Sequence, residues 1–324
     1  MTIFEYSAGA FVYRRTKGGI LLLVLKKPNG EYDMPKGHIE KDENAEEAAT
    51  REIFEETGLS VKFDPFFSES TKYFFYKDKH RIAKQVKFFL AETKEEKVRI
   101  SDEHAGYEWV DEAKAIERLR FKDLVALVPK AIGYVRRIDM MGELNSEYSG
   151  LAKRSAGWSL SRRLVPGEGR LDAPIMLIGQ APGANEDMQL RPFIGRSGRL
   201  LDSILRRVHI NRRKTYITSV VQFFPPENRL PTPAEVKACK PFLDRQIEIV
   251  NPRYVVLLGN LAAKTVLDIG EVQKNHGMII ERDGIKYMMT FHPAAALRFG
   301  ENIPLMEADF KNFAGIMKEL SLHP

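Results

Sequence analysis

Cysteine is almost absent from this chain, because Cys239 is the single thiol among 324 residues. One cysteine cannot form an internal disulfide, which excludes the disulfide-stapled secreted proteins and fits a reducing compartment. Long apolar runs are missing too, and the longest aliphatic run, Ile20 to Leu25, is too short to cross a bilayer. The N-terminus lacks the charged-then-apolar pattern of a secretory signal. The sequence therefore predicts a cytoplasmic protein with no membrane partner.

Length and charge indicate two domains of different character. A chain of 324 residues is about twice the usual domain length. Residues 1–150 hold 25 Lys and Arg against 27 Asp and Glu, and residues 151–324 hold 25 against 17, so the two parts carry net charges of −2 and +8. Such a basic second part favours a polyanionic partner, DNA in particular. Met140 to Arg154 is rich in Gly, Ser, Glu and Lys and is interpreted as a linker, which places the domains at 1–147 and 148–324.

The segment from residue 37 to residue 59 predicts a loop followed by a capped helix. Asn44 with Glu47 three residues later forms an N-cap and a capping box. Gly58 stands where a left-handed C-cap is expected. Residues 45–57 should therefore be helical.

Three carboxylates, those of Glu52, Glu55 and Glu56, fall on one face of this expected helix, within an arc of roughly 100°. Unpaired, they would repel one another. A hard divalent cation relieves this repulsion, and Mg²⁺ (or Mn²⁺) bound by a few carboxylates commonly holds substrate phosphates. The pattern predicts a polyphosphate substrate. The alternative interpretation is an amphipathic helix with a solvated acidic face.

The spacing in this segment is Gly, five residues, Glu, seven residues, Arg-Glu, apolar, any, Glu-Glu, any, Gly, apolar, and it resembles the Nudix box without a departure. The resemblance implies hydrolysis of the pyrophosphate bond of a nucleoside diphosphate linked to another group. It implies metal ligation by Glu52, Glu55, Glu56 and the Gly37 carbonyl. Arg51 would orient a carboxylate of the helix rather than contact substrate.

Outside the box, four segments resemble the asymmetric diadenosine tetraphosphate hydrolases of that superfamily: Ser7-Ala-Gly-Ala, Met34-Pro-Lys-Gly-His38, Tyr73-Phe-Phe-Tyr76 and Ser101 to Val110. By this resemblance Lys36 and His38 meet phosphates, Tyr76 stacks on adenine, and Glu103 ligates a second metal or serves as base. Metal ions would polarise a phosphoryl oxygen and activate water for in-line attack, leaving AMP and ATP. RNA 5′ ends and oxidised or deoxy nucleotides remain alternative substrates.

The two parts of the chain differ in the order of their expected strands and helices. In the first part, short β-like runs around the box helix predict a mixed sheet flanked by helices, and the Nudix resemblance implies that this is an α/β/α sandwich. In the second part, apolar runs alternate with helical patterns, which predicts a doubly wound, mostly parallel sheet. These runs span Ile175 to Ile178, Tyr216 to Val221, Tyr254 to Leu258 and Tyr287 to Thr290.

The segments that follow these runs should converge at the carboxyl ends of the strands. They are Gly179-Gln-Ala-Pro-Gly183 with Arg191-Pro-Phe193-Ile-Gly195, then Ser219 to Pro226, and Phe291-His292-Pro293. Together they resemble the family 4 uracil-DNA glycosylases from about residue 153 to the C-terminus. The resemblance implies that Phe193 stacks on a flipped base, that His292 stabilises the departing base anion, and that Leu297 or Arg298 enters the gap in the strand.

Departures from that family concern both catalysis and its cofactor. Gln180 replaces the glutamate of the first loop, so it occupies a catalytic position without a carboxylate. Ser219 replaces the asparagine that reads uracil. The family holds an iron–sulfur cluster on four thiolates, whereas this chain keeps only Cys239, so no cluster is expected. Phe223 stands at the third thiolate position and Ser155 and Trp158 near the first two, and we expect Phe223, Phe224 and Trp158 to fill the cluster's space.

Two hypotheses for the second domain follow from these residues. It is either a working base-excision enzyme, favoured by Phe193 and His292, or a DNA-binding module with little or no glycosylase activity, favoured by Gln180 and Ser219. For the whole chain, the main interpretation is a dinucleoside polyphosphate hydrolase coupled to a glycosylase-like domain. The alternative is a sanitiser of modified nucleoside triphosphates whose second domain binds DNA. The oligomeric state is left open.

Overall fold

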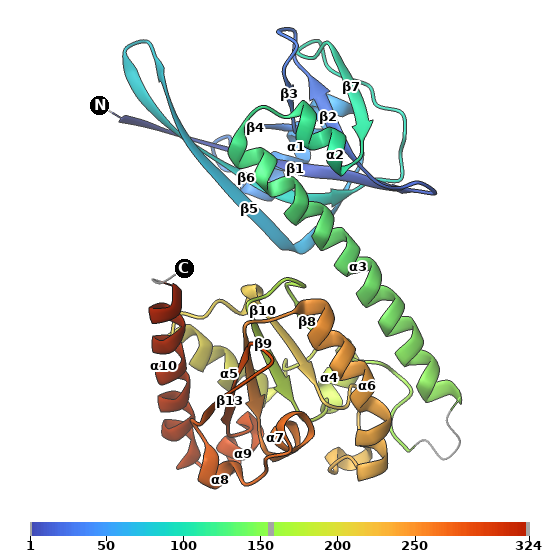
Figure 1. Ribbon diagram of the computed structural model, residues 1–324, viewed down its shortest axis with the longest axis vertical. Helices are drawn as coiled ribbons and strands as arrows, with labels where there is room; N and C mark the ends of the chain where they lie inside the picture. Colours follow the sequence, from blue (N-terminus) through green and yellow to red (C-terminus); the bar gives the residue numbers. More distant parts are fainter. Residues whose placement is uncertain (1, 155–158, 322–324) are drawn as a thin grey trace. The chain divides into compact units, whose positions relative to one another are not determined.

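The computed structural model describes residues 2–154 and 159–321, apart from the side chains of a few residues near the gaps, at the C-terminal end and at one strand end. The chain divides into two compact units, Met1–Arg136 and Arg137–Pro324 (Figure 1). This division falls earlier in the chain than the domain boundary expected at residue 147. Each unit is an α/β structure with its own sheet, as the sequence predicts.

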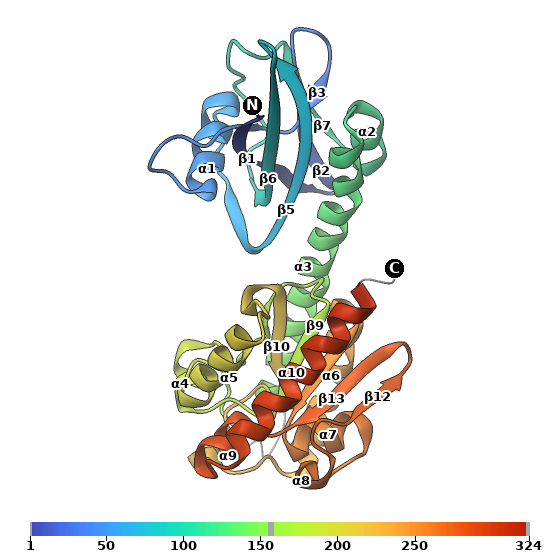
Figure 2. The same ribbon diagram turned by 90° about the vertical axis from the view of Figure 1, so that its left-hand side faces the viewer.

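The first unit is built on a seven-stranded mixed sheet. β1 runs parallel to β6 and antiparallel to β2, and the main strand order is β3-β2-β1-β6-β5. Figure 2 shows α1 on one side of this sheet and α2 and α3 on the other. The elements are β1 (Thr2–Thr16), β2 (Gly19–Lys26), β3 (Tyr32–Asp33), β4 (Lys36–His38), α1 (Ala45–Thr57), β5 (Lys62–Lys77), β6 (His80–Glu92), β7 (Gly106–Val110), α2 (Glu112–Arg118) and the first part of α3 (Lys122–Arg154).

Helix α1 is fixed to the sheet by one apolar stripe. Ala48, Ala49 and Ile53 are fully buried and pack against alternate residues of β1, including Ala8 and Ala10. Burying this stripe leaves the acidic stripe of α1 outside the core, which directs its carboxylates toward β4.

The second unit contains a six-stranded sheet in the order β12-β13-β11-β9-β10-β8. Its four central strands are parallel, and the edge strands β8 and β12 are antiparallel to their neighbours. The four expected apolar runs all lie on these central strands, which confirms the doubly wound prediction. The elements are β8 (Glu168–Gly169), β9 (Ile175–Gly179), α4 (Ala184–Gln189), α5 (Arg196–Arg207), β10 (Thr215–Ser219), α6 (Pro233–Val250), β11 (Tyr254–Leu258), α7 (Asn260–Leu267), α8 (Val272–Asn275), β12 (Ile279–Arg282), β13 (Ile285–Thr290), α9 (Pro293–Arg298) and α10 (Asn302–Ser321), with 3-10 turns at Arg212–Lys214 and Pro226–Asn228.

The segment from Met140 to Arg154, expected as a linker, is helical, and that expectation is wrong. Met141, Leu144 and Tyr148 are buried at helical spacing within the second unit. Their burial, rather than the local Gly and Ser content, decides the conformation. None of the helices formed by the described residues is both long and apolar enough to span a membrane.

Candidate functional sites

The loop that enters α1 is held in the conformation that the sequence predicts. The Asn44 side chain accepts from the backbone of Glu46 at 2.9 Å and of Glu47 at 3.1 Å, and Glu47 accepts from the Asn44 backbone at 2.7 Å. Gly58 ends the helix with a φ of 68° and donates to the Phe54 carbonyl at 2.8 Å. These caps fix where the helix begins, and therefore which residues of α1 face β4.

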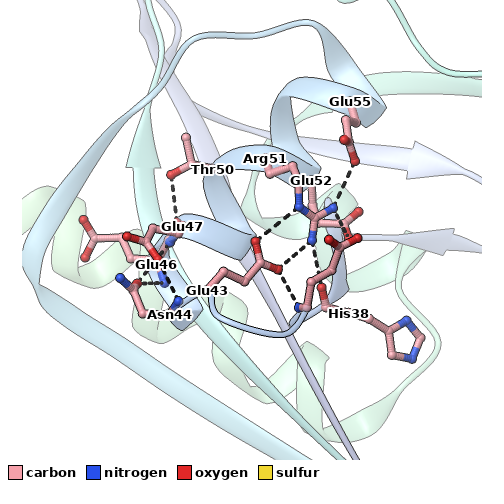
Figure 3. A network of polar contacts seen from close by, with 10 residues as sticks. His38, Glu43, Asn44, Glu46, Glu47, Thr50, Arg51, Glu52 and Glu55 are labelled. Carbon is pink, nitrogen blue, oxygen red and sulfur yellow. Dashed lines mark hydrogen bonds and ion pairs between the residues drawn. The ribbon is translucent and has the colours of Figure 1, made fainter.

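Arg51 links the acidic residues of α1 to the preceding loop (Figure 3). Its guanidinium donates to Glu52 at 2.9 Å and to Glu55 at 3.1 Å. The other side of the guanidinium donates to Glu43 at 2.7 Å and to the His38 carbonyl at 3.0 Å. This arrangement agrees with the orienting role that the Nudix box implies for Arg51.

Glu52 and Glu56 lie against strand β4. A Cβ atom added at Gly37 would lie 1.8 Å from the carboxyl carbon of Glu52, so only glycine leaves room for that carboxylate. Glu56 accepts from the backbone N–H of Lys36 at 3.0 Å. The pKa of Glu56 is raised to about 8, mainly by burial and also by the charges of Glu52 and Asp33, against the opposing effect of Lys36.

This donor set fits a hard divalent cation. Two close carboxylates, one of them with a raised pKa, are the arrangement that a positive charge between them stabilises. In the described part of the chain, no three His, Cys, Asp or Glu side chains already form a metal-binding group. Glu55, the third carboxylate, is turned toward Arg51 and its side chain is 58% exposed. Ligation by all three would therefore require Glu55 to leave Arg51.

The structure brings His104, rather than Glu103, close to the carboxylates of α1. Glu103 is exposed, whereas the His104 Nε2 lies 3.7 Å from a Glu56 oxygen. Burial lowers the pKa of His104. The sequence holds a signal for His104, because it follows Glu103 in the same quoted segment, but a side chain's direction in a loop does not follow from its spacing.

A cavity of about 580 Å³ lies beside Lys36 on the face of the sheet opposite to α1. Tyr73 and Phe121 stack across it with ring centroids 6.2 Å apart and planes 12° apart. Two lysines hold Asp33 at its floor: Lys27 donates to Asp33 at 2.7 Å and Lys36 at 2.6 Å. Burial opposes ionisation of Asp33, yet these lysines lower its pKa.

Two expected substrate-binding residues lie outside this cavity. Tyr76 is 77% exposed and does not line it, whereas Tyr73 and Phe121 do. His38 is also exposed, and its Nε2 lies 3.3 Å from Glu5 and 3.3 Å from Lys84. Lys84 itself lines the cavity, and burial lowers its pKa. Lys36 alone of the expected substrate-binding residues of this unit lies at the cavity.

In the second unit, a pocket of about 460 Å³ opens at the carboxyl ends of β9, β10 and β13. The sheet reverses its order there, because β9 is flanked by β10 on one side and β11 on the other. The pocket brings together residues quoted from separate loops of the sequence: Gln180, Gly183, Phe193, Ser219, His292 and Arg298.

Phe193 is held in the pocket by contacts on both sides of its loop. It is 7% exposed and has a φ of 53°, a left-handed conformation unusual for a bulky residue. The tip of its ring packs against Gly179 at the end of β9. A Cβ atom added to Gly179 would lie only 2.5 Å from the ring, so this position requires glycine. Its ring centroid is 5.8 Å from that of His292.

Glu186 holds this loop in place, and the sequence reasoning missed it. The buried carboxylate accepts from the backbone N–H groups of Gly195 at 2.8 Å, Ile194 at 3.1 Å and Gly183 at 3.2 Å. It therefore joins the loop after β9 to the loop that carries Phe193. The signal for this role was the position of Glu186 one turn into the helix after the glycine loop, where a capping carboxylate is favoured.

His292 presents one ring nitrogen to the pocket. Its Nδ1 accepts from the backbone N–H of Ala294 at 3.1 Å, so the proton of the neutral ring resides on Nε2. That Nε2 is buried and makes no hydrogen bond to any residue the structure describes. Burial lowers the pKa of His292 to about 4. A neutral N–H donor is thus available at the pocket wall.

The remaining residues of the pocket occupy its rim and base. Ser219 is buried at the end of β10, and a Cβ at Gly179 would lie 3.4 Å from its hydroxyl oxygen. The backbone carbonyl of Gln180 accepts from Val221 at 3.1 Å. Arg298 stacks over Phe299 at 5.4 Å, beside Leu297, which is 38% exposed. This rim combines apolar surface with a positive charge.

Comparisons with known proteins agree with this geometry. The NUDIX domain model matches residues 4–127, and the Uracil DNA glycosylase superfamily model matches residues 166–320. A type-4 uracil-DNA glycosylase of Sulfurisphaera tokodaii is 36% identical over 184 residues, 53% of this chain and 81% of that protein. One from Thermotoga maritima is 45% identical over 142 residues, 43% of this chain and 74% of that protein. An asymmetrical bis(5′-nucleosyl)-tetraphosphatase of Caenorhabditis elegans is 30% identical over 127 residues, 38% of this chain and 91% of that protein.

The chain belongs to both the Nudix and the uracil-DNA glycosylase families.

The iron–sulfur cluster expected of a type-4 uracil-DNA glycosylase does not fit this chain. Cys239 is its single cysteine, and burial raises the pKa of that thiol to about 11, which opposes the thiolate a cluster needs. Tyr148, which hydrogen-bonds Cys239, packs edge-on against Phe223 at 4.9 Å and stacks on Phe242 at 4.1 Å. Phe224 is only half-buried, and the expected positions Ser155 and Trp158 lie outside the described residues.

Proposed function

We propose that the Nudix unit hydrolyses a dinucleoside polyphosphate, diadenosine tetraphosphate to AMP and ATP. This proposal rests on the aromatic cavity lined by Tyr73 and Phe121. Lys36 lies beside this cavity and belongs to β4, the strand that contacts the acidic helix α1. Parallel rings accept an adenine, and Lys36 and Lys84 would neutralise phosphates next to it. The C. elegans relative named as an asymmetrical bis(5′-nucleosyl)-tetraphosphatase supports the same substrate.

Glu52, Glu55, Glu56 and the Gly37 carbonyl would hold Mg²⁺ or Mn²⁺ in this unit. When bound, such a cation supplies Lewis-acid polarisation of a phosphoryl oxygen and lowers the pKa of a water. The chain's own residues would do the positioning, because Arg51 fixes the carboxylates that would hold the cation. Glu103 would serve as base or second ligand only after its loop moved inward.

Product analysis tests this substrate. Purified protein with Mg²⁺ is offered diadenosine tetraphosphate, oxidised and uracil-bearing deoxynucleoside triphosphates and a triphosphorylated RNA, and the products are separated by anion exchange. We expect AMP and ATP in equal amounts from the first substrate and the highest kcat/KM for it. A higher kcat/KM for a modified triphosphate would replace this proposal by the sanitiser function.

We propose that the second unit excises uracil from DNA. The carrying observation is the buried, unpartnered Nε2 of neutral His292 beside the ring of Phe193. Phe193 would stack on the extruded base, and the His292 N–H would donate to its carbonyl oxygen as the N-glycosidic bond breaks and the electron pair leaves on the base. Water would then add to the oxocarbenium-like sugar and give its proton to the departed base anion, with Gln180 only holding the water by hydrogen bonds, because an amide cannot act as base.

Excision is tested on labelled single- and double-stranded oligonucleotides with one uracil, read by alkaline cleavage. The wild-type protein should cleave both, and His292→Ala should lose cleavage while binding DNA as before. Wild-type protein that binds DNA and leaves uracil in place would instead establish the second candidate, a DNA-binding module. Gln180 and Ser219 favour that candidate, since they line the pocket where the family has a carboxylate and a uracil-reading amide.

DNA would reach this pocket along the basic second part of the chain, and the single cysteine supports a cytoplasmic site of action.

A further inference from the structure

The outer end of the Nudix sheet exposes four large aromatic side chains. Phe4 is 68%, Tyr6 55%, Phe74 59% and Tyr76 77% exposed. Scattered apolar residues on a surface need no explanation, but four aromatic rings on adjoining strands mark a binding surface. Phe74 also lines the cavity beside Lys36, whereas Phe4, Tyr6 and Tyr76 belong neither to that cavity nor to the core.

Strand register places these rings on one face. Phe4 of β1 pairs with Ala83 of β6, and Ala83 pairs with Phe74 of β5. The rows two residues away on either side contain one further ring each. Tyr76 of β5 lies in the row of Thr2 and Arg81, and Tyr6 of β1 lies in the row of Gln85 and Lys72. Residues two apart point to the same side of a sheet. We define the aromatic face by its three cross-strand rows: Thr2, Arg81 and Tyr76; Phe4, Ala83 and Phe74; Tyr6, Gln85 and Lys72.

The charge of the aromatic face is entirely positive. Among its nine residues, Lys72 and Arg81 are basic and none is acidic. The Arg81 guanidinium lies 4.1 Å from the centre of the Phe74 ring, so a cation stands among the aromatic rings. The turn that joins β5 and β6 holds one acidic and one basic exposed residue, Asp78 and Lys79, so the positive charge of the face comes from Lys72 and Arg81.

We propose that the aromatic face binds single-stranded DNA. Rings on alternate residues of one strand are spaced about 6.8 Å apart, a distance that successive bases of an extended single strand can match. Sequence-tolerant single-strand binding combines such stacking with basic groups that follow the phosphates. A duplex keeps its bases stacked inside and offers no partner for the rings. We choose DNA rather than RNA because DNA is the nucleic acid on which the glycosylase family of the second unit acts.

Binding of a uracil-free, fluorescein-labelled single strand to the full-length protein tests the proposal. Phe4→Ala and Tyr6→Ala should each weaken binding by at least about fivefold, the lower end of the loss expected for one stacking partner. Arg81→Gln should also reduce the slope of log K against log salt by about 0.7. Ile3→Ala is the matched control, because Ile3 is 42% exposed on the same strand and points to the opposite face. Equal affinities for all four variants and wild type would overturn the proposal.

Photo-crosslinking separates this surface from the glycosylase pocket. A single strand containing 4-thiothymidine is irradiated with the protein, and crosslinked tryptic peptides are identified by mass spectrometry. We expect crosslinks in residues 1–14 and 73–77, and the same RNA sequence should crosslink there less. Crosslinks confined to residues 159–321 would overturn the proposal. So would aromatic variants that abolish a dimer in sedimentation while DNA binding stays unchanged, since the face would then join two copies of the chain.

Discussion

The protonation state of His292 decides what its ring can do for a departing base. Protonation would keep the Nε2 donor but place a second N–H on Nδ1, which could then no longer accept from Ala294, so the ring keeps its orientation only while the pH lies above its pKa of about 4. We expect uracil excision to stay constant from neutral pH down to about 5 and to fall as the pH approaches 4. A pH profile of single-turnover excision measures this. An inflection near 6.5 would mean that the ring is solvated rather than buried.

The same shift has a consequence for stability. The folded-state pKa of His292 lies below that of the unfolded chain, so between about pH 6.5 and 4 the unfolded state binds a proton that the folded state does not. Stability is therefore lost as the pH falls through this window. Urea unfolding at pH 7 and pH 5 should show a smaller pH-dependent loss for His292→Asn than for wild type, and equal losses would contradict the burial of the ring.

Charge removal on α1 tests the metal-binding assignment residue by residue. Glu52→Gln and Glu56→Gln each keep the side chain's shape and remove one negative charge next to Gly37. Each should lower kcat/KM for the polyphosphate by at least about a hundredfold, or roughly 2.7 kcal/mol of transition-state stabilisation. Glu46→Gln, an exposed change on the same helix, is the control and should leave kcat/KM within about twofold. Near-normal hydrolysis by both site variants would remove the carboxylates from the mechanism.

Individual side chains were predictable where chemistry depends on spacing and less so where it depends on direction. The carboxylates of α1 and the pair Phe193 and His292 were found from motifs; the structure places Glu52 and Glu56 beside β4 and Phe193 beside His292, while Glu55 is turned toward Arg51. Adenine stacking was predicted for Tyr76, whereas Tyr73, three residues earlier on the same strand and therefore on the opposite face, lines the cavity. Glu186 was missed because its three backbone partners lie in two loops whose approach is a tertiary event.

At the scale of elements, local signals succeeded for α1 and failed for the end of α3. The caps of α1 are satisfied by residues within one turn, so its bounds follow from the sequence alone. The last turns of α3 carry many polar residues, and their helicity depends on burying Met141, Leu144 and Tyr148 in the second unit. That apolar spacing of three and four residues was a usable signal, but composition outweighed it in the linker interpretation.

Tyr148 links α3 to Phe223 and Cys239, two of the positions that the resemblance to the family 4 glycosylases assigns to cluster ligands. Tyr148→Ala removes the ring that stacks on Phe242 and meets Phe223, and it should cost about 3–5 kcal/mol of unfolding free energy. Phe223→Ser should cost at least as much, because it also buries a hydroxyl without a partner. Half-buried Phe224→Ser is the control. Thermal unfolding measures these effects, and elemental analysis of the wild-type protein should find no iron. Bound iron, together with little effect of Phe223→Ser on stability, would mean that the protein does hold an iron–sulfur cluster.

At the scale of the whole molecule, each site is complete within its own unit. The residues that line the aromatic cavity of the first unit lie between Asp33 and Leu124, and those around the glycosylase pocket lie between Val165 and Phe299. The last part of α3 belongs by its contacts to the second unit: Arg137 donates to the carbonyl of Leu171 at 2.9 Å and to that of Val250 at 2.8 Å. The structural boundary therefore precedes the one suggested by composition.

This difference predicts how the second unit behaves when it is separated from the first. A fragment of residues 137–324 keeps Arg137, Met141 and Leu144 and should unfold cooperatively near the temperature of the same unit in the full chain. A fragment of residues 148–324 loses the burial of two apolar side chains, each worth about 1.5–3 kcal/mol, and should melt at least about 6 °C lower. Calorimetry of both fragments measures the difference. Equal melting temperatures would mean that α3 contributes nothing to the second unit before Tyr148.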